Sequence, residues 1–307
     1  DLPDKESATM FFQDCKLAHQ AQITGISHSV KEILPPDLLD LTQLQKEANI
    51  RYGFTASEVY DIAQSLYEKK LISYPRTSSR YLTEDVFDSL PPIMARLLSW
   101  ELFPAAKGTG GIDISNLSRH VISAEKANVH HAIIITGIRP GNLSEKEMQV
   151  YKLVAGRMLE TFMAPCRIET TNVEAVVCAA QHFKAEQTRI IEAGWHDVFM
   201  RSDMVPKSGY SVNELPEVEK SDTLNVCGCN MVHKKQLPVN PFTDAELVEY
   251  MEQNGLGTVS SRTNIIRTLV NRKYIRYSGK YIVPTPKGMF TYETIRGKKI
   301  ADTSLTA

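Results

Sequence analysis

The spacing of apolar residues changes twice along the chain, and this change constrains the fold more than any other feature. Residues 8–33 alternate loosely between apolar and polar side chains, and a period of two returns from residue 168 to about residue 232. Between these stretches the apolar residues recur at helical spacing. Alternation is typical of half-buried antiparallel strands, and a period of three to four is typical of amphipathic helices. Strand patterns on both sides of a helical block predict a discontinuous β-domain that carries an α-rich insert.

Capping boxes mark the starts of the predicted helices. Thr55 and Glu58 begin one helix, which follows a shorter predicted helix over residues 43–50. Ser144 and Glu147 begin another. In such a box, the two side chains accept hydrogen bonds from backbone amides of the first turn that have no partner within the helix.

The end of the chain has a pattern of its own. A helix begins at Thr243, a glycine-containing turn and a second helix follow, and a hairpin turns at Ser278-Gly279. This order is the outline of a winged helix-turn-helix. Residues 258–280 contain six Lys or Arg residues and no Asp or Glu, as a surface that contacts phosphates needs. A solvated basic face on a purely structural subdomain is the alternative.

These patterns predict an α+β multidomain protein with an α-rich insert between the arms of an antiparallel β-domain. We expect the first arm of a β-rich arch at residues 1–47, the α-rich domain at 48–165, the return arm at 166–236 and a winged-helix-like DNA-binding subdomain at 237–307.

Composition narrows the class of protein. With 307 residues, 42% of them hydrophobic, the chain can build two or three packed domains. The net charge of −1 means that a nucleic-acid site must be a local basic patch. Five scattered cysteines predict a reduced intracellular protein without a disulfide framework. Cys227 and Cys229 with His233 provide only one short cysteine pair, where a zinc ribbon needs two, so we expect no metal in this chain.

The segment LISYPRTSSRYL at residues 71–82 is the sharpest local feature. Pro75 holds Tyr74 in an extended conformation, and in an extended segment Tyr74 and Arg76 point the same way. A phenol beside a guanidinium suits a nucleophile and its electrophilic clamp. The pKa of a tyrosine phenol is ordinarily about 10, so little phenolate is present at neutral pH. A nearby positive charge favours the phenolate, and the same charge neutralises a bound phosphodiester. Taken alone, however, a Tyr-Pro pair in a strand is more often a packing element.

The second local feature is VHHAIIIT at residues 129–136. Adjacent histidines diverge in a helix and in a strand, so His130 and His131 are not expected to chelate one ion together. One of them can donate a hydrogen bond to a phosphate oxygen. The isoleucine run supports the alternative that both histidines border a buried strand.

Four blocks in this order resemble type IA DNA topoisomerases, in particular their topoisomerase III branch. LISYPRTSSRYL resembles that branch's SYPRTDSRYL, HHAIIIT resembles its HHAIIPT, and GLGTVSSRTNIIRTLVNRKYI resembles its Gly-Leu-Gly-Thr region. The run DLTQLQKEANIRYGFTASEVYDIAQSLYEKKLISYPRT is similar over its whole length. The blocks span residues 38–275, and the resemblance covers nearly the entire chain.

The resemblance implies an enzyme that cleaves one DNA strand transiently, passes another strand and reseals the first without ATP. Tyr74 falls on the nucleophile that forms a 5′-phosphotyrosine, Arg76 on the arginine that positions the phosphate, and His130 on the histidine that contacts the same region. Ser260, Ser261 and Arg272 fall in the segment that grips the single strand upstream of the cleavage site. Thr258 and Arg262 match the Thr and Arg that this branch has beside them, and all five are expected to bind DNA.

Two positions depart from the family pattern. Ser78 stands where the branch has an aspartate, which removes an acid near the site, and Ile135 stands where it has a proline. The acids that follow the tyrosine motif are read as charges at a helix N-terminus.

The resemblance also implies a Toprim domain, which precedes this region in the family and supplies a catalytic glutamate and an Asp-x-Asp cluster for Mg²⁺. We therefore expect this chain to be a fragment without that domain, in which Mg²⁺ serves the complete enzyme and no cofactor is held here. The expected partners are single-stranded and negatively supercoiled DNA and no membrane, and the expected location is the bacterial cytoplasm. The alternatives are a non-catalytic module that binds single-stranded DNA and a degenerate topoisomerase.

Overall fold

The chain divides into two compact units, each made of two separate stretches of sequence. Unit 1 comprises Asp1–Leu34 and Pro165–Pro238, and unit 2 comprises Pro35–Ala164 and Val239–Ala307. The computed structural model describes residues 4–100, 102–104, 112–127, 129–178, 181–199, 215–233, 240–302 and 305. The four-segment division with boundaries at residues 47, 165 and 236 stays a prediction, and its last boundary lies outside the described residues.

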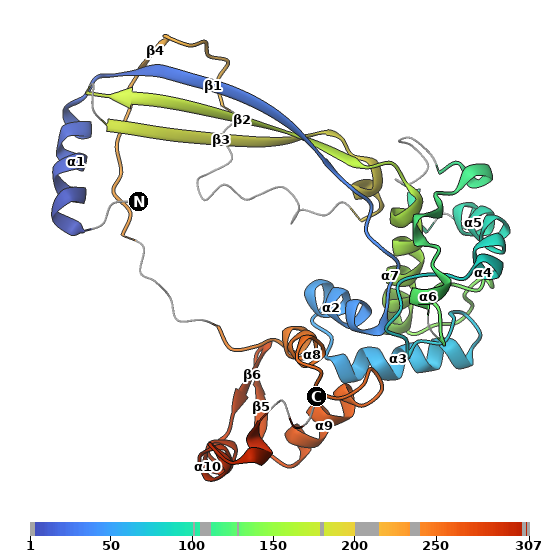
Figure 1. Cartoon of the computed structure of the whole chain (residues 1–307). Coiled ribbons are helices and arrows are strands. Elements are labelled where there is room, and N and C mark those ends of the chain that lie inside the picture. The colour runs from blue at the N-terminus through green and yellow to red at the C-terminus, as the bar shows by residue number, and fades with distance from the viewer. Residues whose placement is uncertain are drawn as a thin grey trace. The chain divides into compact units, whose positions relative to one another are not determined.

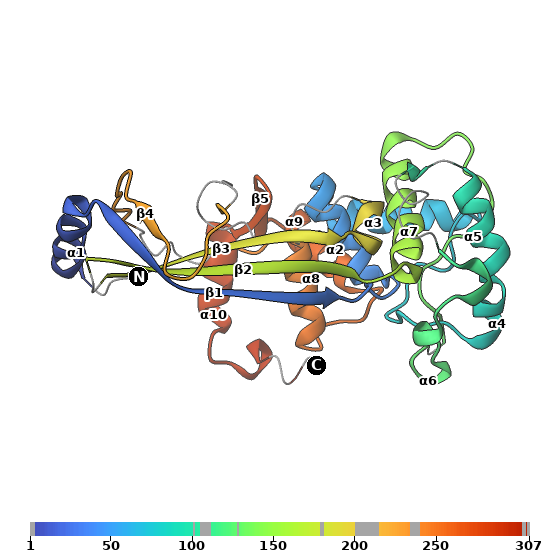
Figure 2. The same cartoon turned by 90° about the horizontal axis from the view of Figure 1, so that it is seen from above.

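Unit 1 contains a four-stranded antiparallel sheet in the order β3-β2-β1-β4. The three long strands run side by side (Figure 1, Figure 2). Its elements are α1 (Lys5–Leu17), β1 (Gln20–Ile33), β2 (Cys166–Val177), β3 (Gln181–Glu192), a 3₁₀ helix (Gly194–Val198) and β4 (Thr223–Asn225). Trp195 is buried, and its indole Nε1 donates to the Ile33 carbonyl at 2.9 Å. The sheet therefore joins strands from both ends of the unit's sequence, as the period of two predicts, but the prediction of strand to about residue 232 was wrong at residues 194–198, which form the 3₁₀ helix.

Residues 8–17 are helical, so the prediction of strand from residue 8 was wrong at its start. Asp4 caps α1 by accepting a hydrogen bond from the Ser7 amide at 2.8 Å. Phe11 and Cys15 are four positions apart and so share a face of this helix; Phe11 packs on Phe183 at 5.5 Å between ring centroids, and Cys15 is buried. The alternation of apolar residues here is weak and short. The N-terminal cap and the packing of one helix face therefore decide the local structure.

Unit 2 begins with the predicted helical block. Both predicted capping boxes are present, at Thr55 with Glu58 and at Ser144 with Glu147. Most of α7 is buried, and α2 and α3 both pack against it. The helices are α2 (Leu41–Tyr52), α3 (Ala56–Glu68), α4 (Glu84–Asp88), α5 (Leu90–Ser99), α6 (Ala124–Ala127) and α7 (Glu145–Phe162), with 3₁₀ turns at Ile114–Asn116 and Arg119–Val121.

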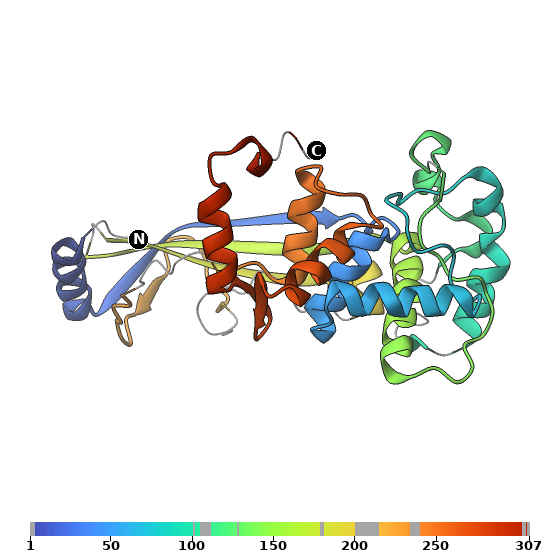
Figure 3. The same cartoon turned by 90° about the horizontal axis from the view of Figure 1, so that it is seen from below.

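The C-terminal elements of unit 2 follow the predicted order of helix, turn, helix and hairpin. They are α8 (Asp244–Gln253), α9 (Arg262–Asn271), β5 (Ile275–Ser278) and β6 (Tyr281–Pro284), and then α10 (Pro286–Ile295) and a 3₁₀ turn (Lys299–Ala301) that the pattern did not predict. In unit 2, α8 lies against α2, and α9 lies against α3 (Figure 3).

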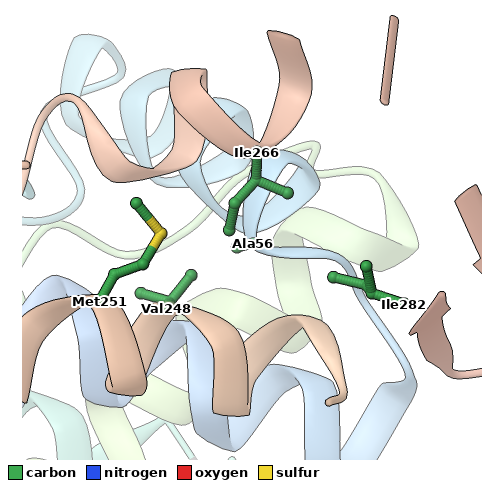
Figure 4. Close-up of a cluster of buried hydrophobic side chains, with 5 residues drawn as sticks. All are labelled: Ala56, Val248, Met251, Ile266 and Ile282. Atoms are coloured by element: carbon green, nitrogen blue, oxygen red, sulfur yellow. The ribbon is translucent and has the colours of Figure 1, made fainter. Parts of the chain in front are cut away.

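A buried apolar cluster joins these C-terminal elements to the first helices of unit 2. It consists of Ala56, Val248, Met251, Ile266 and Ile282 (Figure 4). Ala56 begins α3, whereas the other side chains come from α8, α9 and β6. The C-terminal region and the α-rich region therefore share one core.

No helix in the described ranges combines the length and the apolar composition needed to cross a bilayer.

Candidate active site

The two motif segments singled out in the sequence lie side by side. Ile72 forms an antiparallel bridge with Ile135, and the Ser73 amide donates to the Ile134 carbonyl at 2.8 Å. The Ser73 hydroxyl donates to the Ala132 carbonyl at 3.1 Å and accepts from the Ile134 amide at 3.0 Å. The tyrosine segment and the histidine segment are therefore one structural feature, although about sixty residues separate them in sequence.

Two buried hydroxyl groups fix the backbone that follows the tyrosine. The Thr77 hydroxyl donates to the His130 carbonyl at 2.8 Å, and the Ser79 hydroxyl donates to the Lys126 carbonyl at 2.7 Å. The Thr77 carbonyl accepts from the amide of Leu41, the first residue of α2, at 3.1 Å. Residues 73–79 are thus held from both sides, which limits the positions that the Tyr74 side chain can reach.

Tyr74 is half-buried and lies between two other rings. Its ring centroid is 4.5 Å from that of His130, with the planes at 45°, and 5.4 Å from that of Tyr67, with the planes at 78°. His130 is exposed. The structure therefore brings together Tyr74 and His130, two of the three predicted catalytic residues, at a place that solvent reaches.

Arg76 is held by α3. Its Nη2 donates to Gln64 Oε1 at 3.1 Å, and its guanidinium carbon lies 5.1 Å from the centroid of the Tyr60 ring. The Nε–H of Arg76 is buried and has no hydrogen-bond partner within the described part of the chain. A buried donor without an acceptor is costly and uncommon in folded proteins. Arg76 is therefore a charged group held by α3, with one buried N–H that no acceptor in the described chain satisfies.

Sequence reasoning missed the residues of α3 that position this site. Tyr60, Gln64 and Tyr67 are spaced i, i+4 and i+7, which places them on one face of the helix. That face contacts Arg76 through Tyr60 and Gln64, and Tyr74 through Tyr67. The polar and aromatic stripe was visible in the sequence, but only the fold shows what it faces.

The departures from the family pattern lie in different surroundings. Ser78 is exposed, whereas Ile135 is fully buried. In the first turn of α4, Glu84 pairs with Arg119, and a hydrogen bond from the Thr83 side chain lowers the pKa of Asp85. Across the described ranges, no three His, Cys, Asp or Glu side chains converge as metal ligands.

Three of the five predicted DNA-binding residues, Thr258, Ser260 and Ser261, lie in the turn before α9. Gly257 has a φ of +70°, and a Cβ there would lie 2.9 Å from Ser261 Oγ, so the turn requires glycine. The Thr258 amide donates to Ser261 Oγ at 2.8 Å, and the hydroxyls of Thr258 and Ser260 are 3.2 Å apart. Thr258 and Ser260 are exposed, so this turn presents hydroxyl groups to solvent.

The two predicted arginines differ in their surroundings. Arg262 is buried, and its guanidinium donates to the Leu256 carbonyl at 3.3 Å and to Glu252 Oε1 at 3.1 Å. These bonds tie the end of α8 to the start of α9, which is a structural role. Arg272 is exposed after the last turn of α9. A contact of either arginine with DNA stays a prediction.

A solved structure shares the fold of this chain. The structure matches full-length topoisomerase I from Thermotoga maritima with a TM-score of 0.74 and 23% sequence identity, over 100% of this chain and 50% of that one. At that identity the likeness concerns the fold, and it confirms the predicted mixture of helices and antiparallel sheet.

The sequence gives the family. The family described as DNA topoisomerase matches residues 1–307, and the chain belongs to it, as the motifs predict. A DNA topoisomerase 3 from Bacillus licheniformis is 32% identical over 299 residues, which cover 90% of this chain and 41% of that protein. A DNA topoisomerase 1 from Methanocaldococcus jannaschii is 31% identical over 293 residues, which cover 95% of this chain and 37% of that protein. The chain thus spans about two fifths of the length of these relatives.

Proposed function

We propose that this chain is the part of a type IA DNA topoisomerase that carries the nucleophile, with Tyr74 as the residue that attacks DNA. The observation that supports this most is the position of the Tyr74 ring, half-buried and 4.5 Å from the ring of exposed His130. Arg76, two residues on, has a buried N–H without an acceptor in the described chain. A phenol, an imidazole and a guanidinium on two adjoining segments are the groups needed for attack on a phosphodiester.

In the proposed reaction the phenolic oxygen of Tyr74 attacks a phosphorus of single-stranded DNA. A bond forms between the tyrosine oxygen and phosphorus, and the bond from phosphorus to the 3′-oxygen of the preceding nucleotide breaks. The phenol loses its proton, and the leaving 3′-oxygen gains one. The 5′-phosphotyrosine keeps a phosphodiester, so the 3′-hydroxyl can reverse the reaction without ATP once another strand has passed.

The chain's own residues contribute positioning and charge. Arg76 neutralises the phosphate in the transition state, while Gln64 and the Tyr60 ring hold the guanidinium in place. His130 donates a hydrogen bond to a phosphate oxygen. The backbone hydrogen bonds of Ser73 and Thr77 keep the tyrosine and histidine segments in register.

The remaining groups of the reaction are assigned to a Toprim domain outside this chain. That domain supplies the catalytic glutamate and the carboxylates for Mg²⁺, an ion that neutralises phosphate charge when bound. The proposal agrees with the share of its relatives' length that this chain spans. We assign the protein to the bacterial cytoplasm, in association with DNA.

We assign the single-strand grip to the winged-helix-like elements from α8 to β6. The exposed hydroxyls of Thr258 and Ser260, together with Ser261 in the same turn, and the cation of Arg272 contact the backbone of the strand upstream of the cleavage site. Arg262 holds this turn through Leu256 and Glu252. Single-stranded and negatively supercoiled DNA are therefore the proposed substrates.

The test is covalent capture of DNA. End-labelled single-stranded DNA and Mg²⁺ are incubated with the chain fused behind the Toprim domain of a relative, and adducts are resolved on a denaturing gel. We expect an adduct that Tyr74→Phe abolishes and that the matched control Tyr67→Phe retains. An adduct that survives Tyr74→Phe would refute the assignment of the nucleophile.

A second candidate function is a non-catalytic module that binds single-stranded DNA. The absence of converging metal ligands from the described residues favours it for the chain on its own. The same gel separates the two functions, because the module would bind DNA in a filter assay yet form no adduct even behind a Toprim domain. Ser78→Asp in that fusion tests the degenerate alternative, since a large gain in adduct would indicate an impaired site.

A further inference from the structure

The stretch from the end of α9 to the turn after α10 carries a strong local charge. Residues 272–299 contain eight Lys or Arg residues, all of them exposed, and a single acid, Glu293. Glu293 is itself paired with Arg296 at 3.7 Å. The whole chain has a net charge of −1, so positive charge is concentrated in this stretch. A surface of this charge is complementary to a phosphate backbone.

The first turn of α10 is packed against the residues that follow α9. The Thr285 amide donates to the Tyr274 carbonyl at 3.0 Å, and Lys287 Nζ donates to the Arg272 carbonyl at 2.8 Å. Gly288 allows the close approach, because a Cβ there would lie 2.0 Å from the Tyr274 carbonyl oxygen. Figure 1 shows α10 beside the β5–β6 hairpin. The start of α10 therefore has a fixed position next to Arg272, the arginine that the proposed function assigns to the single strand.

Phe290 and Lys287 lie on one face of α10, because residues three apart are neighbours on a helix. Phe290 is 76% exposed. Lys287 Nζ lies 4.5 Å from the centroid of the Tyr274 ring and bonds the Arg272 carbonyl, which holds the ammonium in place. An ammonium has three N–H donors, so donors remain for a phosphate. This face of α10 thus presents an exposed phenyl ring one turn from a positioned cation.

Tyr292 is the other large exposed ring of α10, and it lies on a different face. Two residues correspond to a rotation of about 200° around a helix, so Tyr292 points away from the face of Phe290. Tyr292 is 50% exposed, and the guanidinium carbon of Arg296 lies 6.0 Å from its ring centroid. The helix therefore carries two exposed aromatic side chains, of which only Phe290 shares a face with Lys287.

We propose that α10 binds single-stranded DNA together with Arg272, with a base stacked on the Phe290 ring and phosphates contacted by Lys287 and Arg272. The inference rests on the proposed function and adds a base-stacking element to its single-strand grip. Proteins that bind single strands combine cations along the backbone with aromatic rings on which bases stack. An apolar protein surface suits this stretch less well, because its cations would lose water on burial without gaining opposite charges.

The test is binding of fluorescein-labelled oligothymidylate to the full chain, measured by fluorescence anisotropy. Phe290→Ala should weaken binding by roughly 5 to 100 fold, the loss expected for one stacked base. Phe290→Tyr should keep most of the affinity, because it keeps the ring. Tyr292→Ala is the matched control and should bind as the unsubstituted chain does. A strand of the same length without bases should bind Phe290→Ala and the unsubstituted chain equally.

The dependence of binding on salt separates stacking from charge. Arg272→Gln should make the slope of log affinity against log salt shallower by about 0.7, the value for one phosphate contact with a single strand, whereas Phe290→Ala should leave the slope unchanged. Equal binding of oligothymidylate by Phe290→Ala and Tyr292→Ala would overturn the inference. So would an equal loss of affinity by Phe290→Ala for the strand without bases.

The adduct through Tyr74 in the Toprim fusion tests the proposed function separately. If the fusion forms that adduct while Phe290→Ala binds oligothymidylate normally, the base-stacking role is wrong and the proposed function stands. If the chain binds no single strand and the fusion forms no adduct, both are wrong.

Discussion

At the scale of single residues, the guanidinium of Arg76 has some N–H groups that are hydrogen-bonded and one that is not. Gln64 and the Tyr60 ring hold it, and its buried Nε–H has no acceptor among the described residues. Arginine suits such a site because its planar guanidinium can donate several hydrogen bonds, stack on an aromatic ring and bind a phosphate at the same time. Lysine has only a single ammonium group. In the proposed reaction, a cation that is held in place before DNA binds would lower the reorganisation that the transition state requires.

We therefore predict that Arg76→Lys slows adduct formation by roughly 10² to 10³ fold in the Toprim fusion, the loss expected for an electrostatic stabiliser of a transition state. Gln64→Ala should slow it by about tenfold, since it removes only the positioning contact. Single-turnover cleavage of labelled single-stranded DNA measures both. The matched control is Arg119→Lys, because Arg119 is an exposed arginine of unit 2 paired with Glu84. Equal rates for Arg76→Lys and Arg119→Lys would contradict the prediction.

At the scale of elements, the start of α7 is joined to the end of α3 by one carboxylate. Glu147 completes the capping box of α7 through the Ser144 amide at 2.9 Å, and it accepts hydrogen bonds from Lys69 at 2.5 Å and Ser65 at 2.8 Å. The Lys69 bond, followed by those from Ser144 and Ser65, lowers the pKa of Glu147 from 4.5 to about 2. Because α3 carries the residues that position Arg76, this junction also supports the site.

We predict that Glu147→Gln lowers the free energy of unfolding by about 1 to 2 kcal/mol at pH 7. A carboxyl whose pKa is lowered on folding stabilises the protein above the unfolded pKa, here 4.5, and loses that contribution as the pH falls towards about 2. The difference in free energy of unfolding between the unsubstituted chain and the variant should therefore be constant above pH 6 and should shrink as the pH falls from 5 to 2. Urea unfolding at several pH values measures it, with the exposed first-turn residue Glu145, as Glu145→Gln, for the control. A difference that widens in acid would have the wrong sign.

The sequence predicts a helix well where its signal lies within a few neighbouring residues. The boxes at Thr55 and Ser144 and the cap at Thr243 begin helices as predicted, because a cap and its partner lie three residues apart. The same rules failed for residues 8–17, where a weak alternation competed with the Asp4 cap.

The site depended on contacts that no local window contains. The bridge between Ile72 and Ile135 is set by tertiary packing, so the sequence motifs gave the identities of Tyr74 and His130 but not their contact. Arg157 is another example, since it is buried and pairs with Glu160 at 2.9 Å and with Glu47 at 2.7 Å. A charged residue is expected at the surface unless it is paired, and the more distant of these partners lies in α2.

At the scale of the whole molecule, the division of the chain into two units predicts how it unfolds. Each unit has buried apolar residues of its own, and the chain passes between the units at residues 34–35, 164–165 and 238–239. Those described in unit 1 are few: Cys15, Ile23, Cys166, Ile168, Val173, Val177, Trp195 and Val198. Since buried apolar area is the main source of stability, unit 1 should be the less stable of the two.

We predict two unfolding transitions in urea, with unit 1 unfolding first. Ile23→Ala should lower the stability of the first transition, and Ile266→Ala that of the second, each by about 2 to 5 kcal/mol, because both side chains are at most 3% exposed. Hydrogen exchange assigns the effects, since Ile23→Ala should weaken protection of β2 and β3 while leaving α8 and α9 unchanged, and Ile266→Ala should do the reverse. If either substitution weakened protection equally in both units, the chain would unfold as one cooperative body and the prediction would be wrong.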